Sequence, residues 1–272
     1  AVKIRERRQI LPPLSGIRRK TMTDDERQMH RFTELAEACY AKGRYTFTDF
    51  LGLAECDLFL RAAKDFSYVP YTLFGGTEGC ERVMVRFGDE ESLGYAPEEF
   101  PIVCLRIAPA APKFAEPLTH RDCLGALMNL GVKRECLGDL ARGEECMYLF
   151  ATKTLAPFLC ENLRRVRHTD VRLTETPPPP SVLVAVERER IQVASPRLDA
   201  IVAHAYRLSR AESSALFAGG RVFCNGRCVT DGTAFPRGGD LLSVRGYGRL
   251  RYVEEDGVSR KGKKNLILET FV

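Results

Sequence analysis

The sequence predicts an α+β fold in three parts: a helical N-terminal region, an α+β middle domain and a C-terminal unit of helix, turn, helix and hairpin. Three observations support this prediction. Apolar residues recur at helical spacing early in the chain, short apolar runs alternate with helical segments in the middle, and four prolines at 177–180 interrupt the chain. With 272 residues, 44% of them hydrophobic, the chain is long enough for two or three domains.

The N-terminal region starts with a basic arm over residues 1–20, whose role the sequence leaves open. Thr23 and Glu26 then form a capping box, and apolar residues recur at helical spacing up to Cys39, until Gly43 ends the pattern. A second helix is expected near 54–64. We therefore assign residues 21–76 to a helical N-terminal region.

The middle of the chain alternates between strand and helix signals. Short apolar runs suited to strands occur at 82–87, 102–107, 146–151 and 171–174. Thr119 can cap one helix that ends at Gly131, and another helix follows Thr152. Residues 77–176 are therefore expected to form a small layered α+β domain.

The prolines at 177–180 form a stiff, extended spacer that predicts a domain boundary. Beyond them, the apolar runs 182–186 and 191–194 suggest a short hairpin, so residues 177–194 are assigned to a linker with a hairpin. We treat residues 253–272 as a tail outside the last domain.

Residues 195–252 carry the signals of a compact helix–turn–helix and hairpin. Apolar spacing predicts an amphipathic helix over 197–207, and a capping box at Ser209 and Glu212 starts a second helix. Asn225 and Gly226 lie between two apolar runs, which is the strongest short-range signal of a hairpin.

This C-terminal segment also carries the net charge of the chain. It contains nine arginines, no lysine and four acidic residues, an excess equal to the formal net charge of +5 for the whole chain. Arginine has a planar fork of donors that suits phosphate, so the expected partner is a polyanion. The alternative is a solvated charged face without a ligand. We assign RNA binding to Arg197, Ser209, Arg210, Arg221, Asn225, Arg227, Arg245 and Arg249.

The same residues carry a resemblance to a known family of RNA-binding domains. The runs 197–199, 208–210, 220–222 and 225–226, followed by Val229 and by Gly239 and Asp240, closely resemble the domain named after ribosomal small-subunit protein S-four. The resemblance implies an αL-motif fold that binds RNA.

Further motifs resemble one branch, the bacterial YlmH family. They are the ending 243–249 and the upstream blocks 46–51, 74–76 with Glu81 and Arg82, and 118–135. The resemblance implies an RRM-like middle domain and a role on the large ribosomal subunit in ribosome-associated quality control, where the protein would hold peptidyl-tRNA on stalled, split subunits. The middle domain lacks the basic-aromatic RNP signature, so no stacking of single-stranded bases is expected there.

The triplet His120-Arg121-Asp122 resembles part of a kinase catalytic loop, but the Asn expected five residues later is Leu127. A kinase is therefore excluded. Thr119 as helix cap, with Asp122 in the first turn, explains the triplet structurally. We keep a second group of candidate RNA contacts here: His120, Arg121, Lys133 and Arg134.

The sequence fits other enzymatic or metal-binding interpretations less well. Pseudouridine synthases use an Arg-Leu-Asp triplet with a catalytic Asp, but here Asp199 opens a helix of the binding unit. Cys224 and Cys228 could form half a zinc site, yet they flank a turn and no other close Cys or His pair exists in the sequence. The nucleotide-binding signatures of tyrosyl-tRNA synthetases are also missing.

We therefore expect a non-enzymatic, cytoplasmic RNA-binding protein without cofactor, metal, membrane or small-molecule substrate. Its expected partners are rRNA, tRNA and the large ribosomal subunit. Eight of the ten cysteines stand singly between Cys39 and Cys160, which fits a reducing compartment better than a disulfide framework. The alternatives are an RNA-modifying enzyme of the pseudouridine-synthase type and a membrane- or division-associated scaffold.

Overall fold

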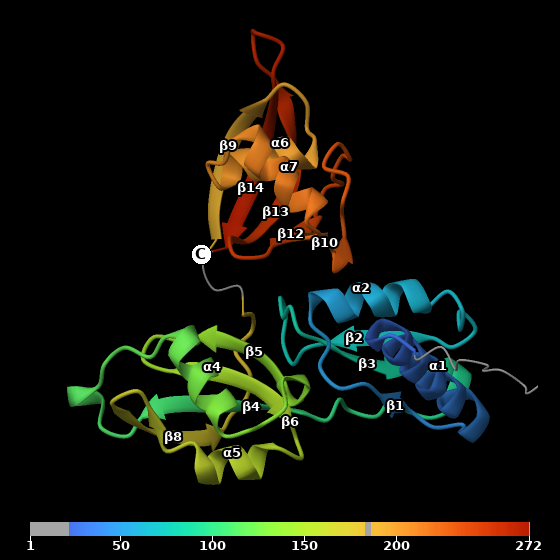
Figure 1. Ribbon diagram of the computed structural model, residues 1–272, viewed down its shortest axis with the longest axis vertical. Coiled ribbons are helices and arrows are strands. Elements are labelled where there is room, and N and C mark those ends of the chain that lie inside the picture. Colours follow the sequence, from blue (N-terminus) through green and yellow to red (C-terminus); the bar gives the residue numbers. More distant parts are fainter. Residues whose placement is uncertain (1–21, 183–185, 272) are drawn as a thin grey trace, which may run out of the picture.

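The computed structural model describes residues 22–182 and 186–271. The predicted basic arm at 1–20 lies outside this range. Figure 1 shows the C-terminal region above the other two, with the end that carries β10 (Val222–Cys224) directed at α2 (Leu53–Ala62). The α+β fold class is confirmed, because helices accompany each of three antiparallel sheets in the described residues.

The N-terminal region contains two long helices and a small sheet. Its elements are α1 (Asp24–Lys42), β1 (Thr46–Phe47), α2, β2 (Tyr71–Phe74), β3 (Met84–Phe87) and the short α3 (Glu90–Leu93). The predicted capping box of α1 is confirmed, and Gly43 ends the helix at φ 58°, a left-handed conformation that favours glycine. Phe32 of α1 meets Phe59 of α2 edge to face, with ring centroids 5.3 Å apart.

The prediction that the helical N-terminal region ends at residue 76 is wrong. The strand expected at 82–87 as part of the middle domain is β3, which lies between β1 and β2 in a three-stranded sheet. The reason is packing: Val85 and Phe87 are fully buried in the core formed by α1 and α2. The hydrophobic core of the N-terminal region therefore extends past residue 76.

The middle region is a five-stranded sheet with two helices. Its elements are β4 (Ile102–Pro109), the turn η1 (Pro112–Phe114), α4 (His120–Asn129), the turn η2 (Arg134–Cys136), β5 (Leu137–Arg142), β6 (Met147–Thr152), α5 (Ala156–Asn162), β7 (Arg165–Val166) and β8 (Thr169–Glu175). The strands lie in the order β5-β6-β4-β8-β7, and all pairs are antiparallel. Apart from the short β7, strands and helices follow one another as β-α-β-β-α-β, the order of ferredoxin-like domains.

The two faces of this sheet have different neighbours. Leu127 of α4 and Leu159 of α5 pack on one face, so both helices cover the same side. On the other face Phe150 packs against Phe50 and Met84 of the N-terminal region. A shared apolar junction therefore joins the two regions.

The proline spacer runs beside the N-terminal region. Thr77 donates its hydroxyl to the carbonyl of Pro179 at 2.6 Å, and the backbone N–H of Val182 donates to the carbonyl of Glu78 at 3.0 Å. These two bonds fix the start of the connection to the C-terminal region.

The C-terminal region is a six-stranded sheet with two helices. Its elements are β9 (Val186–Val193), α6 (Leu198–Ala205), α7 (Arg210–Ala218), β10, β11 (Arg227–Cys228), β12 (Leu241–Val244), β13 (Gly248–Val258) and β14 (Lys264–Phe271). The strand order is β11-β10-β12-β13-β14-β9. Both predicted helices and the hairpin at Asn225 are confirmed; Asn225 has φ 49° and Gly226 has φ 78°, as a type I′ turn requires.

Two predictions for the flanks of this region are wrong. The hairpin expected from 182–186 and 191–194 is contradicted at its turn, because residues 187–190 belong to one strand, β9, which pairs along its length with β14. Residues 183–185 of its first arm lie outside the described range. The expected tail at 253–272 instead holds the second half of β13 and all of β14 up to residue 271. Burial explains both differences, because Ile191 of β9 and Leu266 and Leu268 of β14 lie in the same core as α6. The division into independently folding domains stays a prediction.

Candidate nucleic-acid interface

Arg197 and Arg210 meet at the helical end of the C-terminal region. Arg197 is the N-cap of α6 and forms an ion pair with Asp199, with Nε 3.0 Å from Oδ1. This hydrogen bond raises the pKa of Arg197. Together with Ser195 and Arg210, these residues line a cavity of about 250 Å³. The structure thus brings two of the predicted contacts to one concave surface.

The side chains of Ser209 and Asn225 are occupied by local bonds. Ser209 accepts from the backbone N–H of Glu212 at 3.2 Å, and its own N–H donates to the Glu212 carboxylate at 2.8 Å. Asn225 donates to Asp240 at 2.8 Å and accepts from the N–H of Leu241 at 3.0 Å. Ser209 stabilises the start of α7 and Asn225 stabilises the hairpin turn, and both elements carry the arginines. The role of Ser209 and Asn225 as RNA contacts stays a prediction.

The hairpin end of the C-terminal region docks on the N-terminal region. Asp57 of α2, with a side chain 12% exposed, accepts from Arg227 Nε at 3.2 Å and from the N–H of Cys228 at 3.0 Å. Arg61 approaches its other oxygen at 3.1 Å. Arg249 donates to the carbonyl of Gly79. Two predicted RNA contacts, Arg227 and Arg249, therefore also hold the regions together.

A cleft lies where the three regions meet. It has a volume of about 430 Å³ and is lined by Gly52, Leu53, Glu55, Glu81, Arg82, His120, Arg134, Asp139, Leu140, Arg245 and Arg249. The sequence predicted four of these as RNA contacts, in two groups far apart in the chain. Arg121 and Lys133 do not line the cleft; both are exposed, and Lys133 pairs with Glu135 at 3.4 Å.

Arg221 connects the hairpin base to the cleft. Its Nη2 donates to the carbonyl of Arg245 at 2.8 Å, and the guanidinium of Arg245 lies over the ring of Phe223, 5.0 Å from its centroid. The first bond fixes the turn that presents Arg245, and the cation–π contact orients its side chain.

The charged groups in the cleft shift the pKa values of their neighbours. Desolvation and the Arg134 charge lower the pKa of His120. Burial raises the pKa of Glu81, although the charges of Arg249 and Arg245 act in the opposite direction. Several positive groups and a few carboxylates therefore share a small, partly desolvated space.

Sequence reasoning missed Arg82, Glu81 and Asp139 as parts of this site. Arg82 donates from Nε to the carbonyl of Leu137 at 2.8 Å, and Asp139 accepts from the N–H groups of Glu81 and Arg82 at 2.6 and 3.1 Å. The one available signal was the motif containing Glu81 and Arg82. Nothing in the sequence indicated that it lies next to the 118–135 block.

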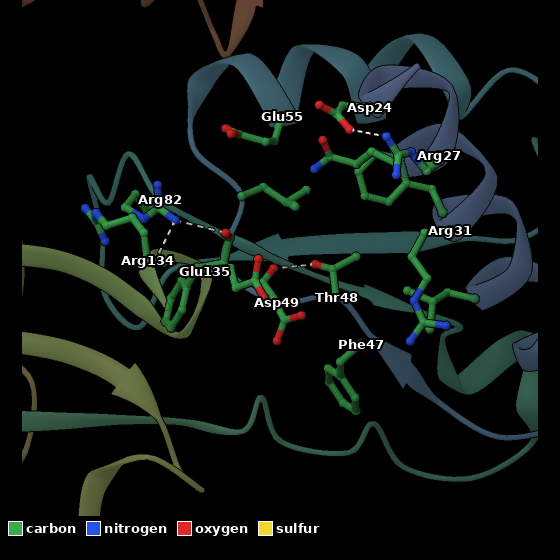
Figure 2. A pocket seen from close by; sticks show the side chains of 15 residues that line it. Asp24, Arg27, Arg31, Phe47, Thr48, Asp49, Glu55, Arg82, Arg134 and Glu135 are labelled. Carbon is green, nitrogen blue, oxygen red and sulfur yellow. Dashed lines mark hydrogen bonds and ion pairs between the residues drawn. The ribbon is translucent and has the colours of Figure 1, made fainter. Parts of the chain in front are cut away.

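A second cavity, of about 550 Å³, is also lined by Arg82 and Arg134. Figure 2 shows these two arginines at one end and Arg27 and Arg31 of α1 at the other. Asp49 lies in the same cavity, where burial raises its pKa. Arg82 and Arg134 therefore line both cavities.

Cys224 and Cys228 flank the turn between β10 and β11. Cys224 and Cys228 are free thiols, and burial raises the pKa of Cys224 to about 11. Within residues 22–182 and 186–271, no group of three or more His, Cys, Asp or Glu side chains is placed to hold a metal ion. Each helix within these ranges is too short or too polar to span a lipid bilayer.

Comparison with known proteins identifies the family. Residues 96–178 match the family model described as "Putative RNA-binding domain in YlmH". The chain is 31% identical over 230 residues to the Ribosome-associated protein quality control protein P2 of Bacillus subtilis (strain 168), covering 83% of this chain and 87% of that protein. The chain belongs to the YlmH family. The family that the sequence motifs indicated is thereby confirmed.

The matched range of the YlmH model spans β4 to β8 and includes His120, Arg134 and Asp139 of the cleft. A solved structure, the Cell division protein ylmH from Streptococcus pneumoniae, is 24% identical, with a TM-score of 0.46; the match covers 60% of this chain and 96% of that one.

Proposed function

We propose that this protein binds rRNA of the large ribosomal subunit and tRNA, including peptidyl-tRNA, in ribosome-associated quality control of stalled nascent chains. The observation that carries the proposal is the arginine-only excess at 195–252, displayed on a concave helical end and at a cleft between three regions. RNA duplexes are recognised mainly through phosphates, 2′-hydroxyls and shape, and rigidly held guanidiniums match that chemistry.

Membership of the YlmH family supports the same function. The 31% identical relative is named as a ribosome-associated quality control protein, and the middle region matches an RNA-binding domain model. We include an S-four-like C-terminal domain and a cytoplasmic location in the proposal.

The direct test is to recover the tagged protein from lysate after crosslinking and to sequence the bound RNA. Enrichment of large-subunit rRNA and tRNA over other RNAs is the expected result. Recovery of RNA at the level of an untagged control would contradict the proposal.

We further propose that the protein acts without catalysis. Asp199, the residue that a pseudouridine-synthase interpretation requires, is held by Arg197 at the start of α6. Purified protein incubated with rRNA and tRNA should leave the nucleosides unchanged by mass spectrometry. A modified nucleoside that disappears with Asp199→Asn would establish the alternative of an RNA-modifying enzyme.

A further inference from the structure

Two guanidiniums are held side by side at the cleft by main-chain carbonyls. Arg82 donates from Nη2 to the carbonyls of Phe50 at 3.0 Å and Arg134 at 3.2 Å. Arg134 donates from Nη1 to the carbonyls of Leu137 at 2.7 Å and Gly138 at 3.3 Å. These bonds orient both side chains, but a carbonyl oxygen does not neutralise a positive charge.

Neither guanidinium has a carboxylate partner in contact among the residues that the structure describes. Glu55 and Asp139 act on both only at longer range, and Asp139 is engaged by backbone N–H groups. Burial lowers the pKa of both arginines, that of Arg134 to about 10 with the Arg82 charge as the next cause. Two partly desolvated like charges side by side are stabilised by an anion.

Donors remain free for such an anion. A guanidinium has five N–H groups. The bonds described above leave Nη1 of Arg82 and Nε and Nη2 of Arg134 without a protein acceptor in the described residues. Gly52 keeps this space open, because a Cβ at that position would lie 2.8 Å from Arg82 Nη1 and 2.9 Å from Glu55 Oε2.

The other walls of the cleft suggest the size and chemistry of the ligand. Its volume of about 430 Å³ suits a small ligand, and Arg245 and Arg249 add positive charge on the side of the C-terminal region. Glu55 and Glu81 line the same space, and their carboxylates can accept hydrogen bonds from hydroxyl groups. A ligand that carries both a phosphate and hydroxyls meets both kinds of group, whereas a bare phosphate would face the carboxylates unfavourably.

We propose that this cleft binds one ribonucleotide, with its phosphate on Arg82 and Arg134 and its ribose hydroxyls facing Glu55 and Glu81. The nucleotide is part of an RNA strand or free in solution, and both sources present the same chemistry. The strand source rests on the proposed RNA-binding function; the free source does not.

The test uses the full chain and three probes: labelled hexauridylate, uridine 5′-monophosphate and total tRNA. Arg245→Gln removes a cleft charge that has no hydrogen bond to a protein acceptor in the described residues. Gly52→Ala narrows the space at Arg82 Nη1. Each should weaken the binding of hexauridylate or of the monophosphate by about tenfold, the loss typical of one charge-assisted contact. The matched controls Arg172→Gln and Gly125→Ala, both exposed and outside the cleft lining, should bind like the wild type.

Arg134→Gln tests the carbonyl-held pair directly, and its melting temperature shows whether the fold survives. If the cleft variants lose binding of hexauridylate alone, the ligand is a nucleotide within an RNA strand. If they lose binding of the monophosphate, the ligand is a free nucleotide. Unchanged affinity of the two small probes in Arg245→Gln and Gly52→Ala would overturn the cleft site, even if wild-type protein still binds tRNA. Failure of the wild type to bind any RNA would instead overturn the proposed function, and the monophosphate titration would then decide the cleft alone.

Discussion

The two ends of the C-terminal region present the same residue type in different surroundings. At the helical end, Arg197 and Arg210 line a concave surface that no other region covers in the described structure. At the hairpin end, Arg227 and Arg249 bond to the N-terminal region. The sequence assigned all four to RNA, because an arginine beside a turn has the same local pattern in both settings. The residue that distinguishes the ends is Asp57, more than a hundred positions upstream.

The largest expected effect comes from removing that residue. Asp57→Ala leaves Arg227, Arg61 and the N–H of Cys228 without their acceptor in a mostly covered contact. The free energy of unfolding should fall by about 2 kcal/mol, as for lost hydrogen bonds to a charged group. Urea denaturation measures the change, with the exposed carboxylate variant Asp65→Ala as control. An unchanged midpoint would show that the hairpin end does not depend on this docking.

The next effect separates the two ends by function. Arg210→Glu should weaken tRNA binding about tenfold and lower the slope of log affinity against log salt by about 0.7 to 0.9 per lost phosphate contact. Arg227→Gln should change the free energy of unfolding more than the free energy of RNA binding, because the guanidinium of Arg227 already has a protein partner. Fluorescence anisotropy over a salt series measures both variants. Equal losses of affinity would remove the distinction between the ends.

A smaller effect is expected at Ser209, where the cap and RNA-contact interpretations differ. Ser209→Ala removes one half of the capping box of α7 and should cost about 1 kcal/mol of stability. The salt slope of RNA binding should stay at the wild-type value, since the hydroxyl accepts from the helix backbone. A changed slope without a change in thermal stability would assign Ser209 to the RNA.

The smallest effect is a pH dependence at the cleft. The pKa of His120 is lowered below its ordinary value of 6.5 by desolvation and by Arg134. Since the unfolded chain then binds the proton more readily, the contribution of this residue to stability is full above pH 6.5 and declines as the pH falls through that value towards the lower folded pKa. His120→Gln should flatten this part of the stability curve. Identical curves for the two proteins in thermal melts from pH 7.5 to 5.5 would contradict the assignment.

Local features of the fold were predictable because neighbouring residues decide them. Thr23 and Ser209 start helices through bonds to residues three positions away, and Asn225 makes its turn with the next residue. The strands missed by the sequence pattern are different. β9 and β14 are separated by some seventy residues, and 186–190 are exposed and highly charged, so no apolar alternation marked the whole strand.

In the candidate site, too, the local motifs were predictable and the long-range contacts were not. The sequence found the arginines of the C-terminal region and the 118–135 block, but assigned them to two surfaces. Arg82 and Arg134 meet because β3 belongs to the N-terminal sheet and Phe150 packs on Met84 across the junction. The sequence spacing predicts neither the pairing of β3 in the N-terminal sheet nor the packing of Phe150 on Met84.

The sequence by itself determined the family, the helix caps, the hairpin turn and the concentration of arginine, because each depends on residue type and short spacing. Only the tertiary structure decided which arginines face solvent, which bond to Asp57 or Gly79, and which share a cleft. The physical reason is that a guanidinium satisfies its donors with whichever acceptor the folded chain brings within reach, and long-range packing of apolar faces, rather than local sequence, places those acceptors.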